Sequence, residues 1–265
     1  MNYFELVKKI IKVNKGQIYN MYSTEALLRI LAWPLTPFFY YLNIMPNTIS
    51  VLALITGIIG SIIILIYGSE YYLIGITMYI ISILFDHCDG NIARVRNIPT
   101  FFGRFMDGLF DIIITGFIQI SLLSLIIRDI LENYPDTSLN YFLSYEINIL
   151  LIMGICLLSL FSTAIQHMIP DRFGGYCRWI NEEHNLKLKP NLREDVSFKF
   201  VDFLNDMQLI FIILGYFSNQ FIFLYFSINL ISSIIMIVFY FYFAKKRMNI
   251  SANDHRTYLS ENKKL

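Results

Sequence analysis

The sequence predicts an all-α integral membrane protein, in which six transmembrane helices follow an interfacial amphipathic helix and both termini are cytoplasmic. Of the 265 residues, 56% are hydrophobic and 15% are charged, whereas about a quarter of a soluble protein's residues are charged. Apolar runs of about 20 residues, enough to span a bilayer core of ~30 Å, recur along the chain. The net charge of +1 says little about partners, because the placement of charges matters more than their sum. We expect no nucleic-acid partner.

Residues 1–44 are predicted to form a cytoplasmic segment with one amphipathic helix. In STEALLRILAWPLTPFFYYL, Ser23 can cap a helix, and apolar residues recur at helical spacing around Arg29. Pro34 and Pro37 are expected to interrupt this helix, so it would lie at the membrane interface rather than cross the bilayer. A soluble lead-in is the alternative. The first residues, MNYFELVKKIIKVNKG, lack the apolar core of a secretory signal, and we expect no cleaved leader.

The transmembrane domain is predicted to occupy residues 45–244, and residues 245–265 are predicted to form a polar cytoplasmic tail. The boundary between the last two spans is the least marked, and a re-entrant hairpin is the alternative there. The six expected spans lie near residues 48–68, 71–90, 106–127, 146–167, 200–217 and 220–243.

The basic residues predict the orientation of these spans, because Lys and Arg accumulate in cytoplasmic segments of membrane proteins. Of the 21 basic residues, all except Arg128 fall before the first span, between the second and third, between the fourth and fifth, or after the sixth. Both termini and the loop after the second span would therefore face the cytoplasm. We expect the protein in the plasma (inner) membrane.

Four carboxylates flank the loop between the second and third spans. Asp86 and Asp89 are three residues apart, and Asp107 and Asp111 are four apart, so each pair shares one helix face. Carboxylates at membrane depth are costly unless they are paired, hydrated or bound. If the two helices are neighbours, the four groups converge and repel one another unless cations lie between them. Oxygen ligands suit Mg²⁺, Mn²⁺ or Ca²⁺ rather than zinc, and two divalent ions ~3.5–4 Å apart would fit.

The residues around the carboxylates favour a phosphorylated ligand. Gly90, Ala93 and Gly103 remove bulk beside the acids, so a large ligand could approach the helix ends closely. Arg94 and Arg96 add positive charge in the same loop. We interpret the whole stretch as a site for a metal-bridged diphosphate.

The order and spacing of these residues resemble the signature D-x2-D-G-x2-A-R-x8-G-x3-D-x3-D of the CDP-alcohol phosphotransferase (CDP-alcohol phosphatidyltransferase) family. Residues 86–111, DHCDGNIARVRNIPTFFGRFMDGLFD, match this signature at every position. Residues 45–50, MPNTIS, resemble the entry to the family's first helix. The six spans and the amphipathic lead-in extend the likeness over nearly the whole chain.

The resemblance implies an enzyme that cleaves a CDP-linked alcohol at its diphosphate, releases CMP and passes the phospho-alcohol to a second alcohol. It implies two divalent metal ions, Mg²⁺ or Mn²⁺, and suggests a homodimer. Asp111 would also act as the base that takes the proton of the acceptor hydroxyl. The implied metal ligands are Asp86, Asp89, Asp107 and Asp111, and the residues that would border the cytidine diphosphate are Asn47, Gly90, Ala93, Arg94 and Gly103.

We expect CDP-diacylglycerol as the donor and a polar alcohol as the acceptor, in phospholipid synthesis among membrane lipids. The reason is a basic segment around the fourth loop, where Arg172, Arg178 and Arg193 could hold an anionic acceptor. Ordinary positive-inside charges that meet anionic lipid are the alternative for these arginines. The reverse arrangement, in which a small CDP-alcohol donates to a lipid or glycan hydroxyl, stays open.

Two other classes of membrane protein also carry carboxylates in helices. An ion-coupled carrier could use an Asp cation site, but it would not need the accompanying glycine and arginine spacing. A prenyltransferase of the aspartate-rich type would need two acidic motifs far apart in the chain, whereas both pairs here lie within residues 86–111.

Overall fold

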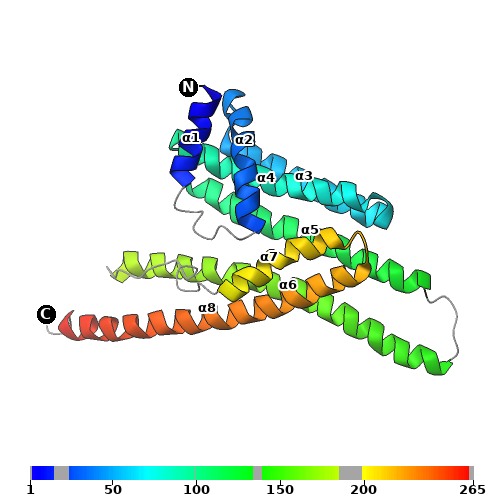
Figure 1. Cartoon of the computed structure of the whole chain (residues 1–265). Helices are drawn as coiled ribbons and strands as arrows, with labels where there is room; N and C mark the ends of the chain where they lie inside the picture. Colours follow the sequence, from blue (N-terminus) through cyan, green and yellow to red (C-terminus); the bar gives the residue numbers. More distant parts are fainter. Residues whose placement is uncertain (1, 15–23, 99, 134–138, 185–198, 263–265) are drawn as a thin grey trace. The chain divides into compact units, whose positions relative to one another are not determined.

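The computed structural model describes residues 2–14, 24–98, 100–133, 139–184 and 199–262. Within these ranges the chain forms helices and no strand, which confirms the predicted all-α class (Figure 1). The helices are α1 (Tyr3–Asn14), α2 (Thr24–Tyr41), α3 (Pro46–Tyr67), the short 3-10 helix η2 (Gly68–Tyr71), α4 (Tyr72–Arg96), α5 (Phe101–Asn133), α6 (Leu139–His184), α7 (Lys199–Leu214) and α8 (Asn219–Asn262).

Four helical stretches in the described chain are long and apolar enough to cross a membrane. The first contains both α3 and α4, which η2 joins, and α7 has only 16 residues. Each of the six expected spans overlaps a different helix from α3 to α8. Six crossings and the cytoplasmic side of the termini stay predictions. The four stretches are Pro46–Arg96, Phe102–Ile130, Leu150–Glu182 and Asn219–Arg247.

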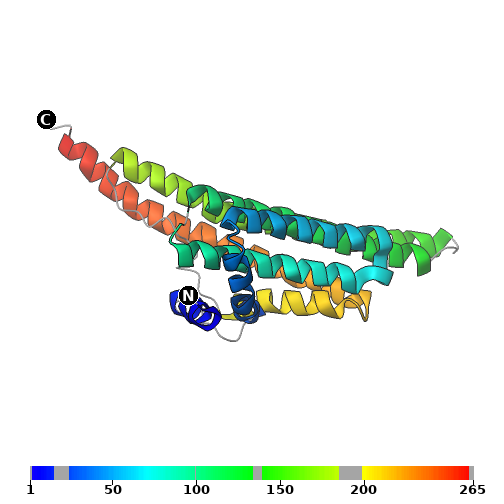
Figure 2. The ribbon, with the colours of Figure 1, turned by 90° about the horizontal axis from the view of Figure 1, so that it is seen from above.

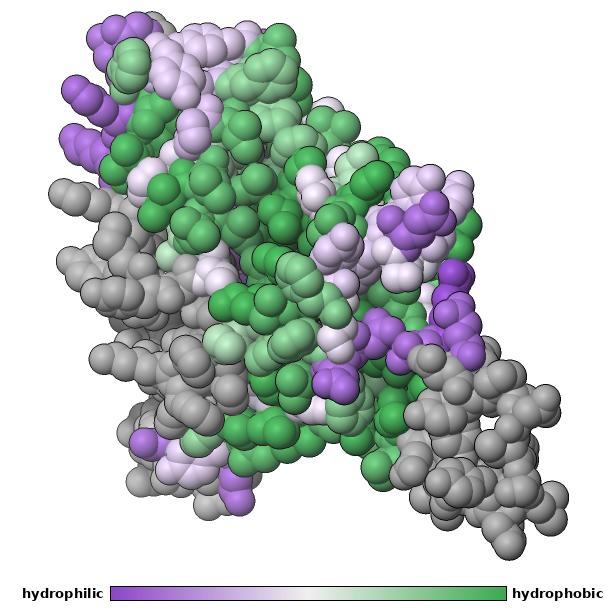
Figure 3. Space-filling view, turned by 45° about the vertical axis from the view of Figure 1, so that its right-hand side comes forward, coloured by the Kyte–Doolittle hydropathy of each residue, from purple (hydrophilic) through white to green (hydrophobic). Residues whose placement is uncertain are grey.

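One face of α3 presents large apolar side chains to the surroundings. Val51, Ile55, Ile59, Ile62 and Ile66 recur at helical spacing and are 37–58% exposed. Figure 3 shows hydrophobic residues, in green, over much of the described surface visible in that view. Contiguous apolar surface of this kind is rare on soluble monomers. It suits a helix that contacts lipid.

The helices divide into two compact units, each with its own buried core. The first unit comprises Met1–Cys156 and Asp206–Phe226, and the second comprises Leu157–Asn205 and Ser227–Leu265. Helices α6, α7 and α8 each contribute one part to either unit. Residues 86–111 therefore lie wholly in the first unit.

Two glycines set the distance between α3 and α4 in the first unit, where α3, α4 and α5 run side by side (Figure 2). A Cβ atom added to Gly60 would lie 2.5 Å from the carbonyl oxygen of Gly75 and 2.8 Å from Cβ of Met78. Small residues let helix backbones approach closely in membranes. The close approach also lets Ser82 Oγ donate a hydrogen bond to the carbonyl oxygen of Ala53, at 2.7 Å.

Replacing Gly60 with leucine is expected to destabilise the first unit by about 1–3 kcal/mol, because the added side chain must displace backbone rather than a flexible side chain. Gly116 of α5 provides the matched control, since nothing lies within 4 Å of a Cβ atom added there. Thermal unfolding of the purified protein in detergent should show a lower midpoint for Gly60→Leu and little change for Gly116→Leu. Equal midpoints for the two variants would contradict this account of the α3–α4 contact.

The main core of the first unit joins α4 and α5 to α7 and the start of α8. Tyr72, Ile118 and Leu122 pack there with Ile222 and Phe226, and all five are at most 2% exposed. Polar groups in this core are paired: the Tyr72 hydroxyl donates to the carbonyl oxygen of Ile212, and Gln119 Nε2 donates to the Tyr225 hydroxyl at 3.1 Å. This core holds the middle of the bundle and leaves the ends of α3, α4 and α5 to form a site.

Helix α2 continues through Pro34 and Pro37 to Tyr41, so the predicted interruption is wrong. Prolines cost backbone hydrogen bonds inside a helix, but α2 packs across α4, where Ala32 and Phe39 are buried with Ile92. Most helical stability in proteins comes from such packing. Figure 1 shows α2 crossing α4.

Helix α1 is a second helix in the N-terminal segment, where the sequence predicted only one. Leu6 and Ile10 are fully buried and pack with Val95 of α4, beside the partly buried Trp33 and Tyr40 of α2. The four-residue spacing of Leu6 and Ile10 was the available signal, but the interleaved lysines obscured it. Both N-terminal helices therefore pack against α4.

The second unit pairs the C-terminal part of α6 with α8 through a polar and an apolar layer. Asn229 Nδ2 donates hydrogen bonds to Ser159 Oγ at 2.9 Å and to Thr163 Oγ1 at 2.7 Å. Farther along, Phe173 of α6 packs with Tyr240 of α8. Interhelical hydrogen bonds between small polar residues are typical of helix pairs within membranes.

Candidate functional site

The second half of α4 carries one face of the candidate site. The helix that contains the predicted span 71–90 continues to Arg96, and its C-cap Asn97 is in the left-handed conformation (φ 56°). Arg94 and Arg96 therefore lie on the helix and not in the loop. A single glycine inside a helix costs only about 1 kcal/mol, so Gly90 does not end it.

This continuous helix changes how the α4 residues are arranged. Asp86, Asp89, Gly90 and Ala93 follow the spacing i, i+3, i+4 and i+7, which places them on one face of a single helix. The carboxylates and the two small residues therefore share one surface.

The start of α5 carries the second face of the site. The helix begins at Phe101, five residues before the predicted span, and Thr100 Oγ1 accepts a hydrogen bond from the Gly103 backbone at 2.9 Å. An N-terminal threonine of this kind is a common helix cap. Gly103, Asp107 and Asp111 then recur every four residues on one face.

The start of α3 contributes the third side through Asn47. Its Oδ1 atom lies 3.1 Å from the position that a Cβ atom would take at Gly103. A side chain at position 103 would therefore press on Asn47. The structure thus brings Asn47 and Gly103 together, as residues of one predicted ligand site should be.

Three of the four predicted metal ligands meet in the structure. Carboxylate oxygens of Asp86, Asp89 and Asp107 lie within 4.8 Å of one another. Asp111 is outside this group: its side chain is exposed, one helical turn beyond Asp107, although its charge still acts on Asp86.

The donor set of this group fits a hard divalent cation. Three carboxylates from two helices supply only oxygen atoms, which Mg²⁺ and Mn²⁺ prefer, and no sulfur or imidazole atom belongs to the group. Asp89 is 7% exposed. A buried carboxylate with acidic neighbours is unfavourable without a compensating positive charge, so the arrangement is one that a cation would stabilise.

Ser50, the last residue of the stretch MPNTIS that resembles the family's first-helix entry, was not among the predicted site residues. Its hydroxyl donates a hydrogen bond to Oδ2 of Asp89, and it also lies 3.2 Å from the carbonyl oxygen of Pro46. The available signal was its spacing from Asn47, because residues three apart on α3 share a face. Ser50 therefore orients the most buried carboxylate of the group.

Arg94 lies against Gly90 and is close to the carboxylates. A Cβ atom at Gly90 would be 3.1 Å from both terminal nitrogens of the Arg94 guanidinium, and the charges of Asp89 and Asp107 act on Arg94. Nε of Arg94 is buried and has no hydrogen-bond partner among the described residues. An anionic oxygen is the partner that this N–H group fits best.

Arg96 has a different role from Arg94. Its guanidinium donates to the carbonyl oxygens of Ile44, at 2.9 Å, and Tyr40, at 3.0 Å, and it lies 5.1 Å from the centre of the Tyr40 ring. These contacts tie Arg96 to the last turn of α2, through Tyr40, and to the turn between α2 and α3, through Ile44. Arg96, which the sequence grouped with Arg94 as positive charge beside a diphosphate, thus has its guanidinium held by backbone carbonyls and the Tyr40 ring.

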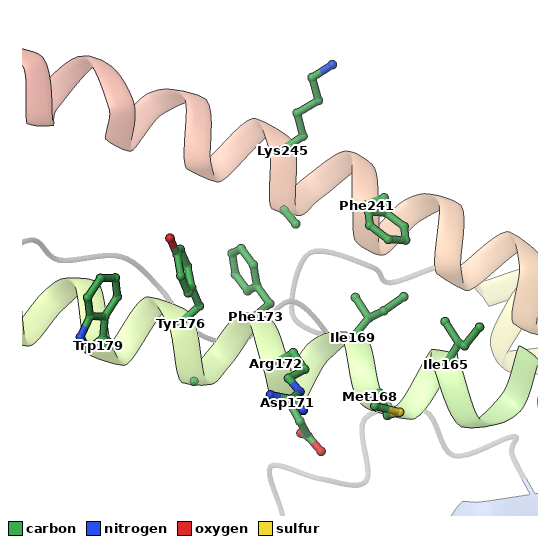
Figure 4. Close-up of a pocket in the computed structure, with 12 residues that line it drawn as sticks. Ile165, Met168, Ile169, Asp171, Arg172, Phe173, Tyr176, Trp179, Phe241 and Lys245 are labelled. Atoms are coloured by element: carbon green, nitrogen blue, oxygen red, sulfur yellow. The ribbon is translucent and has the colours of Figure 1, made fainter.

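The predicted acceptor residues belong to another part of the chain. Arg172 and Arg178 are exposed residues of α6 in the second unit, and Arg193 lies outside the described residues. Arg172 is at the edge of an apolar groove of about 1220 Å³. Figure 4 shows Ile165, Ile169 and Phe173 extending from α6 toward α8 in this groove.

A comparison with models of known protein families identifies the family to which this chain belongs. A family model for CDP-alcohol phosphatidyltransferase matches residues 43–190, more than half of the chain. The match includes α3, α4 and α5 and thus every residue of the carboxylate group. A search of curated proteins finds no match. The chain belongs to the CDP-alcohol phosphatidyltransferase family.

Proposed function

We propose that this protein is a metal-dependent CDP-alcohol phosphotransferase, which moves a phosphatidyl group from CDP-diacylglycerol to a polar alcohol and releases CMP. Membership of the family supports the general reaction, in which a phospho-alcohol passes from a CDP-linked donor to an alcohol acceptor in a membrane. The observation that carries the proposal is the meeting of Asp86, Asp89 and Asp107 within 4.8 Å, with Arg94 nearby.

In this proposal Asp86, Asp89 and Asp107 hold divalent Mg²⁺ or Mn²⁺, and Asp111 completes the binding site of the second ion. The bound cations would supply positive charge that stabilises the diphosphate and the CMP leaving group. Ser50 keeps the Asp89 carboxylate oriented through its hydrogen bond. Arg94 binds a phosphoryl oxygen through its unpartnered Nε–H group.

Small residues and Asn47 border the nucleotide in this proposal. Gly90, Ala93 and Gly103 admit the diphosphate beside the backbone, and Asn47 reaches it from α3. Asp111 takes the proton from the acceptor hydroxyl, which then attacks the phosphorus atom of the donor. The exposed position of Asp111 supports this role, because an acceptor can reach it from outside the carboxylate group.

A lipid as one substrate is supported by the apolar surfaces of the chain. The groove in the second unit is lined largely by apolar side chains, including Phe173 and Phe241, and its charged lining residues are Arg172, Lys245 and Asp171. An acyl chain with an anionic headgroup has this combination of properties. The positive-inside pattern supports an active site that faces the cytoplasm. A homodimer and an inner-membrane location are further parts of the proposal.

Release of CMP tests the proposed function directly. The purified protein would be incubated with CDP-diacylglycerol, Mg²⁺ or Mn²⁺, and a panel of polar alcohols, and CMP would be measured by chromatography. We expect CMP with one acceptor of the panel and none when the cations are removed by chelation. The control exchanges the roles, with a small CDP-alcohol as donor and a lipid or glycan hydroxyl as acceptor.

Three hypotheses predict different results in this assay: transfer from CDP-diacylglycerol, transfer from a small CDP-alcohol, and ion-coupled transport. CMP with a small CDP-alcohol alone would assign the reverse donor and acceptor. An ion-coupled carrier would produce no CMP and would instead show ion-dependent flux across a vesicle that contains the protein. Absence of CMP with both classes of donor would overturn the proposed function.

A further inference from the structure

A buried network joins the two N-terminal helices to Arg94 of the site. Asn91 Oδ1 accepts hydrogen bonds from Arg94 Nη2, at 3.1 Å, and from Asn14 Nδ2, at 2.9 Å. Asn91 Nδ2 donates to Thr36 Oγ1 at 3.1 Å. Asn14, Thr36 and Asn91 are each at most 3% exposed. The network thus connects α1 and α2 to the guanidinium on α4.

The donors and acceptors of this network allow only one orientation of the Asn91 amide. The Arg94 guanidinium has only N–H donors, so the Asn91 atom that faces it is the carbonyl oxygen. Thr36 Oγ1 donates to the carbonyl oxygen of Ala32, at 2.8 Å, and accepts from Asn91. The NH₂ group of Asn91 must then face Thr36, and its carbonyl oxygen must face Arg94. Asn14 Nδ2 is held in turn by the carbonyl oxygen of Ile10, at 2.9 Å.

We propose that Asn91, supported by Asn14 and Thr36, is a positioning residue that fixes the plane of the Arg94 guanidinium. With Nη2 held by Asn91, the buried Nε–H group of Arg94, which has no partner among the described residues, is kept in one position as a donor for a ligand. Fixed donors stabilise a bound anion without the cost of ordering them at binding. The catalytic consequence of this inference rests on the proposed function. Through Asn14 and Thr36, helices α1 and α2 would then support a residue of the active site.

A double-mutant cycle between Asn14 and Arg94 tests the proposal. Asn14→Leu keeps a similar volume and removes the hydrogen bond to Asn91. It is expected to lower kcat/KM for CMP release about tenfold, a coupling within the range of residues in one hydrogen-bond network. In the Arg94→Ala background the same change should have no further effect. An equal loss in both backgrounds would overturn the proposal, because it would mean a general loss of structure.

Lys9 provides the matched control on the same helix. Its Nζ atom donates to the carbonyl oxygen of Val95 at 3.1 Å, so it also ties α1 to α4 but takes no part in the network. Lys9→Met is expected to leave kcat/KM close to that of the wild type. A loss as large as that of Asn14→Leu would show that docking of α1, and not the orientation of Arg94, is what matters, and would overturn the proposal.

A second measurement does not depend on activity. Phenylglyoxal modifies arginine side chains, and mass spectrometry of peptides can give separate rates for Arg94 and Arg96. Arg96 serves as the internal reference, because it is held by Ile44 and Tyr40. Asn14→Leu should raise the rate at Arg94 relative to Arg96, and an unchanged ratio would overturn the inference. If this ratio rises but the wild type releases no CMP, only the proposed function fails.

Discussion

Replacing Asp89 with asparagine is expected to lower the rate of CMP release by at least about 100-fold. Loss of a residue that only hydrogen-bonds to a metal ligand typically costs about 10–100-fold, and Asp89 would bind the ion itself. Asp89 is the most buried carboxylate of the group. Asparagine has the same shape and can still accept the hydrogen bond from Ser50. The substitution therefore removes a charged ligand while preserving the packing. Initial rates of CMP release, measured across a series of Mn²⁺ concentrations, provide the check.

Ser50→Ala is the matched control for this prediction. It removes only the hydrogen bond that orients Asp89 and leaves the charge in place. We expect a smaller loss, which higher Mn²⁺ concentrations partly reverse, whereas Asp89→Asn should not recover. Calorimetric titration of each variant with Mn²⁺ should show the same order of affinities. Wild-type rates in Asp89→Asn would refute the assignment of this group as the metal site.

Much of the candidate site could be predicted because its signals are local in sequence. Pairs of carboxylates three and four residues apart share a helix face whatever the surrounding fold. The packing of the ends of α4 and α5 then suffices to bring the carboxylates of Asp86, Asp89 and Asp107 together. The all-α class followed from composition and from the length of the apolar runs.

The features that the sequence did not predict depend on contacts between distant segments. Arg94 and Arg96 are two residues apart with the same charge, yet Arg94 lies against Gly90, whereas Arg96 donates to carbonyl oxygens of the last turn of α2 and of the turn that follows it. On a helix that continues past Gly90, Arg94 lies four residues after Gly90 and shares its face, whereas Arg96 does not. The partners of Arg96 depend on where α2 crosses α4, which the local sequence does not show. The spacing of Ser50 from Asn47 marked a shared helix face, but its partner Asp89 lies on another helix, and that contact could not be read from the local sequence.

The N-terminal helices show the limit of local rules more directly. Two prolines predicted an interruption of α2, but the energy of packing Ala32 and Phe39 against α4 outweighs the lost hydrogen bonds. Helix α4 ends later, and helix α5 begins earlier, than the predicted membrane spans that they contain. A membrane-span pattern marks where residues are apolar, and polar turns such as the last two of α4 continue the helix beyond it.

Replacing Asp111 with asparagine is expected to lower kcat for CMP release by about 10²–10⁴-fold, the usual contribution of a general base. Asp111 lies one turn beyond Asp107, exposed and outside the three-carboxylate group. If its main task is to take the acceptor's proton, the affinity for the donor should change little. The measurement is a set of full kinetic curves in both donor and acceptor, with the loss confined mainly to kcat.

Glu132 near the end of α5 is the matched control, because it is also exposed and lies on the same helix. Glu132→Gln removes one negative charge, as Asp111→Asn does, but far along the helix from the carboxylate group. Its kinetic constants should equal those of the wild type. An Asp111→Asn variant with wild-type turnover would remove the base from the mechanism. A variant with unchanged kcat and a weakened affinity for Mn²⁺ would instead make Asp111 a metal ligand alone, since a base acts on the chemical step and a ligand acts on binding.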